Sequence, residues 1–259
     1  MNNKISFSEL KTWSECSFKH KLSYIDELKI FNGNLYTAFG TAVHTTAEDL
    51  VLSNITEASS KEHFIESFKK ELDSLGTSLD KKDTKLFESM IEAGQLIVPM
   101  ILKSLVDKFG NYEVFSSEEM LFESIESKDD YNFKGFIDLV IKTEDGLYHI
   151  LDWKTCSWGW NAKKRSDPMT TYQIIYYKNF FAEKHNIDKK KIKTYFGLMK
   201  RTAKKDNIEI FEITSGPKRI SNSLKVLENA ITNIERGVSI KNRLSCKYCE
   251  YDNTEHCVK

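Results

Sequence analysis

The chain has 259 residues, of which 40% are hydrophobic, enough for one large domain or two small ones with a sizeable core. Lysine plus arginine and aspartate plus glutamate both number 38, so the net charge of zero neither requires nor excludes an anionic partner. No apolar run approaches the roughly 18 residues of a membrane span, and the N-terminus lacks the apolar segment of a signal peptide. These features predict a cytoplasmic protein whose five cysteines are thiols or metal ligands and not disulfides.

The N-terminal region begins with a predicted helix. Ser6 and Glu9 have the spacing of a capping box, which places Ser6 at the N-cap. Leu10 and Trp13 would form the apolar face of this helix. Cys16 falls within it, and an isolated cysteine in such a place is usually a small core residue.

A second helix is predicted from Phe39, and His44 lies near its first turn. A single helix histidine is most often structural, but the imidazole is also a good ligand for a divalent metal. From about residue 45 to 110 the apolar residues recur at helical spacing, and we interpret this stretch as a helical layer or insertion.

Residues 135–154 are predicted to form a β-hairpin, with apolar runs on both sides of an Asp-Gly turn. Asp138 and Asp152 each stand where an apolar residue is expected in their strand. Two carboxylates on buried strands need cationic compensation. Lys154 alone would neutralise one of them, whereas a divalent cation would neutralise both, so a buried Asp–Lys ion pair and a metal site are both open at this point.

Two basic stretches follow the hairpin. The first combines cations with aromatic residues, which suits base stacking and phosphate pairing but equally a loop packed on the domain. Its residues are Trp158, Trp160, Lys163, Lys164 and Arg165. The second, residues 184–205, holds nine Lys or Arg residues and one acidic residue, and we predict that Lys200 and Arg201 contact DNA there.

The remaining pattern predicts the fold class. A strand at 113–123 carries Glu118 and Glu119, and a helix follows the hairpin, with Gln173 and Tyr177 on one face because they are four residues apart. Further strands are predicted at 192–199 and 208–213, and a long C-terminal helix is predicted at 217–236. This order indicates an α/β protein with a mixed central sheet flanked by helices.

The last residues contain Cys246, Cys249 and Cys257. Three cysteines within twelve residues of a cytoplasmic chain indicate metal thiolates, and the C-x-x-C spacing lets two sulfurs reach one centre. The fourth ligand would be Cys16 or His256, with Cys156 less suitable because it lies beside the hairpin.

Taken in order, Gly135-Phe-Ile-Asp138, Asp152-Trp-Lys154 and Gln173-x-x-x-Tyr177 resemble the motifs of the PD-(D/E)xK nuclease superfamily. One early and three late cysteines make the chain most similar to its RecB-type branch, which includes the CRISPR-associated adaptation nuclease, the AddB nuclease domain and phage exonucleases. The resemblance covers nearly the whole chain and implies a restriction-endonuclease-like core.

The resemblance implies a role for each matched residue. Ligands of a catalytic Mg²⁺ or Mn²⁺ would be His44, Asp138 and Asp152, helped by the backbone carbonyl of Trp153 and by Glu119 or its neighbour Glu118. Lys154 would position or help to deprotonate the attacking water. Gln173 and Tyr177 would hold the hairpin and the DNA strand near the metal.

The cysteines resemble ligands of an iron–sulfur cluster, usually 4Fe–4S, that ties the two ends of the chain together. Its ligands would be Cys16, Cys246, Cys249 and Cys257. The chain departs from the family in having Asp and not Glu in D-x-K, and in a long gap before Cys257. Zinc is therefore the competing metal, because thiolates also bind it in a tetrahedron.

We therefore expect one nuclease domain over residues 1–259, with a catalytic core at about 113–215 and a cysteine-rich tail at 243–259 that closes onto the N-terminal helix. The expected activity is that of a metal-dependent DNA exonuclease acting on single strands or ends, as in phage recombination or DNA repair, with a possible helicase or recombination partner. Alternatives are an endonuclease or end-trimming subunit of a larger complex and a non-catalytic DNA-binding scaffold. A zinc-ribbon interaction protein would explain the cysteines but not the hairpin.

Overall fold

The structure of the chain, a computed structural model, describes residues 3–31, 33–76 and 80–258. It divides into two compact units, each made of several stretches of sequence. The first unit comprises Met1–Asn32, Met120–Gly135 and Gly216–Lys259, and the second comprises Gly33–Glu119 and Phe136–Ser215. The expectation of a single nuclease domain stays a prediction.

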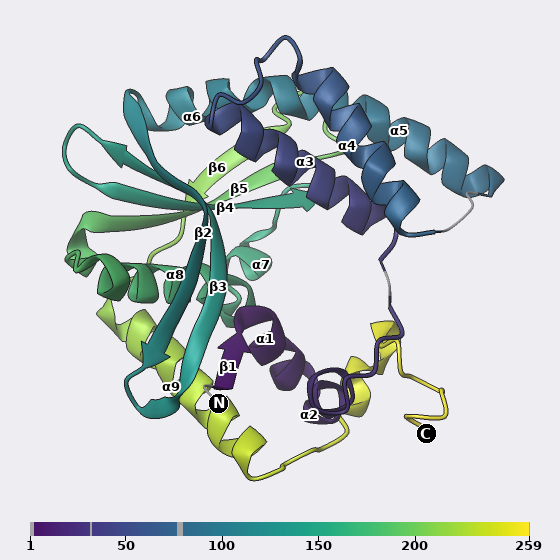
Figure 1. The fold of residues 1–259 in the computed structure, drawn as a ribbon, viewed down its shortest axis with the longest axis vertical. Helices are drawn as coiled ribbons and strands as arrows, with labels where there is room; N and C mark the ends of the chain where they lie inside the picture. Colours follow the sequence, from purple (N-terminus) through teal and green to yellow (C-terminus); the bar gives the residue numbers. More distant parts are fainter. Residues whose placement is uncertain (1–2, 32, 77–79, 259) are drawn as a thin grey trace. The chain divides into compact units, whose positions relative to one another are not determined.

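The central element is a mixed six-stranded sheet, which confirms the predicted fold class (Figure 1). The strand order is β1-β3-β4-β5-β6, with β2 paired to β3. The β1–β3 and β4–β5 pairs are parallel, whereas β3–β4 and β5–β6 are antiparallel. The strands are β1 (Asn3–Ser6), β2 (Tyr112–Ile125), β3 (Lys128–Thr143), β4 (Tyr148–Cys156), β5 (Ile192–Lys200) and β6 (Ile208–Glu212).

In the second unit, helices cover both faces of the β4–β5–β6 sheet (Figure 1). On one face the first four helices share one hydrophobic core with β3, β4 and β5. They are α3 (Leu35–Val51), α4 (Ser60–Ser74), α5 (Lys81–Ile97) and α6 (Ile101–Phe109), the last two joined by the 3-10 turn Val98–Met100. On the other face lie α7 (Ala162–Ser166) and α8 (Pro168–His185), followed by the 3-10 turn Lys189–Lys191.

Local sequence explains where these helices begin. The Asn34 side chain accepts hydrogen bonds from the backbone N–H groups of Tyr36 and Thr37, and Thr37 Oγ1 accepts one from the Asn34 backbone N–H, which forms a capping box. Asp80 caps α5 in the same way, and Pro168 begins α8, where its missing N–H is not needed.

The helical stretch Lys81–Phe109 is long and apolar enough to cross a membrane by length and composition. This differs from the expectation that no apolar run approaches that length. Met90, Ile97, Ile101 and Leu105, however, are buried in the core shared with α3 and the sheet. We therefore interpret the stretch as core helices of a folded α/β domain.

Close packing fixes β4 against β5 beside the predicted site. Trp153 of β4 lies opposite Gly197 of β5. A Cβ atom on Gly197 would lie 2.2 Å from Trp153 Cε3, so a glycine is required for the indole to pack there. Because Trp153 lies between Asp152 and Lys154, this contact also holds those two side chains in place.

The first unit joins the two ends of the chain. It contains α1 (Phe7–Glu15), α2 (Ser17–His20), the π-helical turn Lys21–Ile25, α9 (Pro217–Glu235) and the 3-10 turn Arg243–Tyr248. The backbone N–H of Phe18 donates to the Ile240 carbonyl at 3.2 Å, and Asn242 Nδ2 donates to the Glu15 carbonyl at 2.8 Å. The cysteine-rich tail thus lies on α1 and α2.

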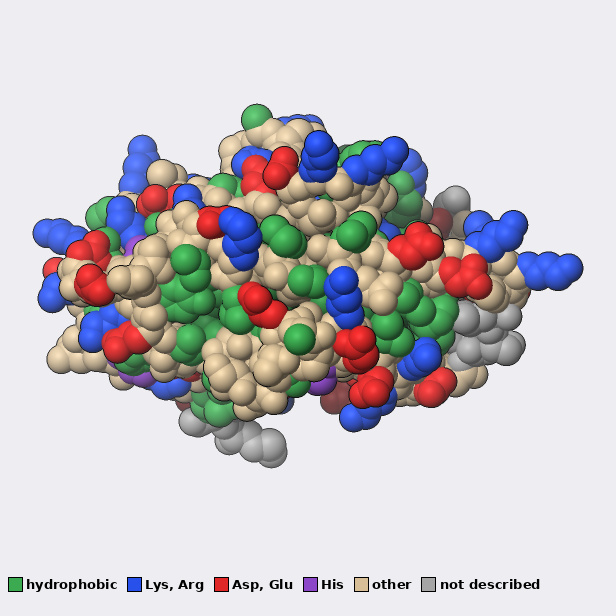
Figure 2. Space-filling model, turned by 90° about the horizontal axis from the view of Figure 1, so that it is seen from above, with side chains coloured by type: hydrophobic (Ala, Val, Ile, Leu, Met, Phe, Trp, Pro, Cys, Tyr) green, Lys and Arg blue, Asp and Glu red, His purple; other side chains and the backbone are tan. Residues whose placement is uncertain are grey.

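The surface shows no segregation of charge on the face seen in Figure 2, where acidic and basic side chains are interspersed between small groups of hydrophobic ones. This agrees with the net charge of zero. On this face, attraction of a polyanion would therefore have to come from a local group of cations.

Candidate active site

The two hairpin aspartates lie where the β3–β4 ladder ends. The ladder pairs Leu139 with Leu151, and beyond it Asp138 Oδ2 accepts a hydrogen bond from the Trp153 backbone N–H at 2.6 Å. Asp152 is only 1% exposed, and Lys154 Nζ lies 2.7 Å from its Oδ2. The two strands therefore separate at a point lined by carboxylates.

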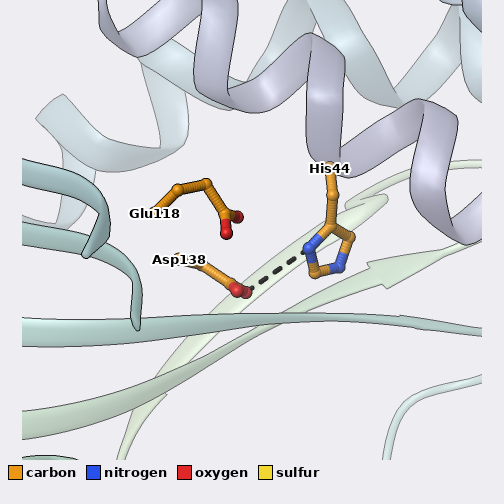
Figure 3. Close-up of side chains that lie close together, drawn as sticks. All are labelled: His44, Glu118 and Asp138. Carbon is orange, nitrogen blue, oxygen red and sulfur yellow. Dashed lines mark ion pairs between the residues drawn. The ribbon is translucent and has the colours of Figure 1, made fainter. Parts of the chain in front are cut away.

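Three side chains meet at this point (Figure 3). Among the residues that the structure describes, His44, Glu118 and Asp138 are the group of potential metal ligands whose ligand atoms all lie within 4.8 Å of one another. His44 projects from α3, and its Nδ1 lies 3.5 Å from Asp138 Oδ2. Asp152 adjoins this group and interacts electrostatically with all three members.

The structure places Glu118, and not Glu119, in this group. Glu118 has a positive φ of 47°, which is uncommon for a residue other than glycine. The kink breaks the alternation of β2, and Glu119 turns to Lys184 and His185 of α8, whose side-chain nitrogens lie 2.8 Å and 2.5 Å from its Oε1. Of the two alternatives that the sequence left open, Glu118 and not Glu119 lies in the candidate metal-ligand group.

Glu48 is a further acidic residue of the site that the sequence analysis missed. Its negative charge raises the pKa values of both Asp138 and Glu118. Glu48 is four residues after His44 and thus on the same face of α3. This spacing was the signal that could have identified it.

Crowding of acidic groups changes the protonation of the site. Burial and then the charge of Asp152 raise the pKa of Asp138 above its ordinary value, against the opposing effect of Lys154. Burial and the charge of Asp138 raise the pKa of Glu118 to about 7. Burial lowers the pKa of His44, so its imidazole is neutral at pH 7, as a metal ligand must be.

Lys154 keeps its positive charge. Burial acts to lower its pKa, but the charges of Asp152 and Asp138 outweigh this effect and raise the pKa above the ordinary value. On α8, Gln173 Nε2 donates to the Tyr177 hydroxyl at 2.9 Å, and the negative charges of Asp152 and Asp138 reach Tyr177. The structure thus brings both members of the Gln-x-x-x-Tyr motif to the hairpin.

These residues fit a hard divalent cation. Asp152 Oδ2 is buried and ion-paired with Lys154 at 2.7 Å, and the Glu118 and Asp138 carboxylates lie beside that pair, so more negative charge gathers here than Lys154 alone offsets. Carboxylates with one imidazole suit Mg²⁺ or Mn²⁺. His44, Glu118 and Asp138 would hold the cation, with Asp152 beside them.

The shifted pKa values predict that metal affinity depends on pH. A cation must displace the protons on Glu118 and Asp138, so we expect the affinity for Mn²⁺ to rise from about pH 6 to about pH 8. In the metal-free protein, the free energy of unfolding should fall as pH rises from 4.5 to about 7, because folded Glu118 retains its proton longer than unfolded Glu118.

Calorimetric titration with Mn²⁺ at several pH values tests this prediction. Glu118→Gln removes one titrating group and should flatten the pH dependence. An affinity that is constant over this range in the wild type would contradict the assignment of these carboxyls as ligands.

The four predicted cluster cysteines line a single cavity of about 360 Å³ in the first unit. Cys16 Sγ accepts from the Asn242 backbone N–H at 3.3 Å. No three of these thiols, all within the described part of the chain, come within 4.8 Å of one another. As the structure places them, these four thiols are therefore not assembled as the ligands of one tetrahedral metal site.

The residues predicted to bind DNA differ in their surroundings. Arg165 donates to Glu209 at 2.6 Å, and the same carboxylate lies 3.8 Å from Lys200. Lys163 and Lys164 are exposed, and Lys164 Nζ lies 4.7 Å from the centre of the Trp160 ring. Arg201 is held at the end of β4 by a 2.8 Å hydrogen bond to Ser157 Oγ.

Comparison with known proteins places this geometry in a family. Residues 4–254 match the model of the PD-(D/E)XK nuclease superfamily. A crystal structure from Eubacterium rectale described as a "Putative exonuclease" has a similar fold, with a TM-score of 0.62 and 13% identity over 98% of this chain and 89% of that one. The structure of SSO0001 matches with a TM-score of 0.43 and 15% identity over 97% and 84% of the two chains. No curated protein shows significant similarity.

Proposed function

The chain belongs to the PD-(D/E)XK nuclease superfamily, and from this premise we propose that it is a metal-dependent DNA exonuclease acting on single strands or DNA ends. The observation that carries the proposal is the meeting of His44, Glu118 and Asp138 beside the Asp152–Lys154 pair. A non-catalytic scaffold would have no need to gather several carboxylates beside a buried Asp–Lys pair.

The residues have distinct tasks in hydrolysis. A divalent cation bound there would orient the attacking water and offset the negative charge that develops on the phosphate. Lys154 contributes a positive charge on the same face of β4, two residues beyond Asp152, where it can stabilise the hydroxide that attacks. The neutral His44 would hold the cation without adding charge, and Tyr177 with Gln173 would support the strand near Asp152.

The exonuclease part of the proposal is tested with linear and circular single-stranded DNA of the same sequence in Mn²⁺. An exonuclease degrades the linear form and leaves the circle intact. Cleavage of the circle would replace this proposal by the alternative, an endonuclease. The E. rectale structure supports the first outcome only through its description and shared fold.

The proposal extends to the cysteines of the first unit. We propose that Cys16, Cys246, Cys249 and Cys257 hold an iron–sulfur cluster, with zinc as the alternative metal. Support comes from the cavity in the first unit that all four cysteines line. The cluster would be structural, because metal binding contributes directly to folding. From the family branch we also infer a helicase or recombination protein as partner. The same inference places the protein in the cytoplasm of a bacterial or phage-infected cell.

Cys249→Ser tests the cluster. We expect the variant, purified without oxygen, to lose its iron and visible absorbance and to melt several degrees lower than the wild type. Cys156→Ser is the matched control, because Cys156 is the fifth cysteine and is not among the residues that line the cavity. Stoichiometric zinc in the wild type would favour the alternative, and absence of both metals would contradict the proposal.

A further inference from the structure

One face of α3 leads from an exposed aromatic ring to the metal ligands. Tyr36, Gly40, His44 and Glu48 are spaced by four residues and so lie along one face of the helix. Tyr36 is 50% exposed, and Gly40 has no side chain to block the path. A groove of about 420 Å³ is lined by Gly40, Thr41, His44, Thr45, Glu48 and Glu118.

The distance along this path suits a short piece of a nucleic acid strand. Eight residues of α-helix separate Tyr36 from His44, a rise of about 12 Å. This length corresponds to about three to four stacked nucleotides at 3.4 Å each. A strand with its scissile phosphate at His44 therefore has bases within reach of Tyr36.

Arg201 connects the Tyr36 ring to the end of β4. Its guanidinium carbon lies 4.7 Å from the centre of the Tyr36 ring, and its Nη2 donates to Ser157 Oγ at 2.8 Å. The Arg201 backbone N–H also donates to the Cys156 carbonyl at 2.8 Å. Trp158, which follows Ser157, is 70% exposed. We call Tyr36, Arg201 and Trp158 the stacking strip.

Positive charge accompanies the stacking strip near the catalytic residues. Burial raises the pKa of the Cys156 thiol. The charges of Lys164, Lys200 and Arg201 act to lower this pKa, whereas Glu209, which lies 3.8 Å from Lys200, acts to raise it. Cys156 and Lys154 lie on the same face of β4, about 7 Å apart at the usual rise per residue. The acidic metal site thus adjoins a group of cations that can attract phosphates.

We propose that the stacking strip binds unpaired bases of single-stranded DNA and positions the strand along α3 toward His44. This proposal rests on the proposed nuclease function and adds its substrate form. Bases in a duplex stack on each other and cannot offer their faces, so exposed rings favour unpaired bases, whereas lysines attract the phosphates of either form. Arg201 is already held in place, which lowers the entropy cost of binding.

Binding of labelled oligonucleotides without divalent cations tests this proposal, because no cleavage then occurs. Oligo-dT provides unpaired bases, and an abasic strand of equal length provides phosphates alone. We expect Tyr36→Ala and Trp158→Ala each to weaken oligo-dT binding about 5- to 100-fold, the loss of one stacked base, and to change abasic binding less than twofold. Tyr36→Phe keeps the ring and should retain the affinity.

Several outcomes would overturn the proposal. Unchanged oligo-dT binding in both alanine variants, or equal losses on oligo-dT and the abasic strand, would show that the rings do not stack on bases. Because the Trp158 side chain is largely exposed, Trp158→Ala should fold normally. A melting curve of each variant checks that it is folded. Base-specific losses in a protein that never cuts DNA would reject the nuclease function but keep the strip. Cleavage of DNA by variants whose oligo-dT binding is unchanged would reject the stacking strip but keep the nuclease function.

Discussion

Asp152→Asn is expected to reduce metal-dependent DNA cleavage by at least about three orders of magnitude, equivalent to about 4 kcal/mol of transition-state stabilisation. The amide keeps the shape of the side chain but removes the charge that lies beside Asp138 and pairs with Lys154 at 2.7 Å. Rates of release of labelled nucleotides in saturating Mn²⁺ measure this effect.

Asp145→Asn is the matched control for this change. Asp145 is an exposed residue in the turn of the same hairpin, and asparagine is also favoured in turns. This control should cleave DNA at nearly the wild-type rate. If Asp152→Asn retained more than about a tenth of the activity while melting normally, the hairpin would not be the catalytic site.

Lys154→Ala is expected to lose cleavage by at least about a hundredfold, typical of a lost electrostatic stabiliser, while keeping Mn²⁺ affinity. Removing a positive charge near the carboxylates cannot weaken their attraction for a cation. The two variants are thus distinguished, because Asp152→Asn should weaken metal binding and Lys154→Ala should not.

The same change should also affect stability. Without Lys154, the buried Asp152 loses its ion-pair partner, so the metal-free variant should melt below the wild type, and Mn²⁺ should restore much of the difference. Calorimetry and melting curves with and without Mn²⁺ measure both effects. Cleavage within threefold of the wild type would exclude a role for Lys154 at the reacting atoms.

Much of the fold could be predicted because its signals are local. Two apolar runs on either side of an Asp-Gly turn indicated the hairpin, which the structure forms from β3 and β4. The predicted strand at 192–199 is β5, Ile192–Lys200, and the predicted helix at 217–236 is α9, Pro217–Glu235. The four-residue β1 was missed, because it is too short to show a period and is defined by its pairing with β3.

The site was less predictable where long-range contacts or an unusual backbone geometry determine which side chains meet. Strand alternation could not choose between Glu118 and Glu119, because the positive φ of Glu118 interrupts that alternation. The stacking of Arg201 on Tyr36 joins residues far apart in sequence, and no local pattern indicates it. The sequence pattern along the two strands thus identified Asp138, Asp152 and Lys154. The residues that surround these three in space could be identified only from the folded structure.

The most direct test of the account is degradation of end-labelled single-stranded DNA by the wild-type protein and Asp152→Asn, with Mn²⁺ and with excess chelator. The account predicts short labelled products only for the wild type with Mn²⁺, because cleavage needs both the cation and the Asp152 carboxylate. Absence of products in every reaction, or equal products from both proteins, would contradict the assignment of His44, Glu118, Asp138, Asp152 and Lys154 as a nuclease site.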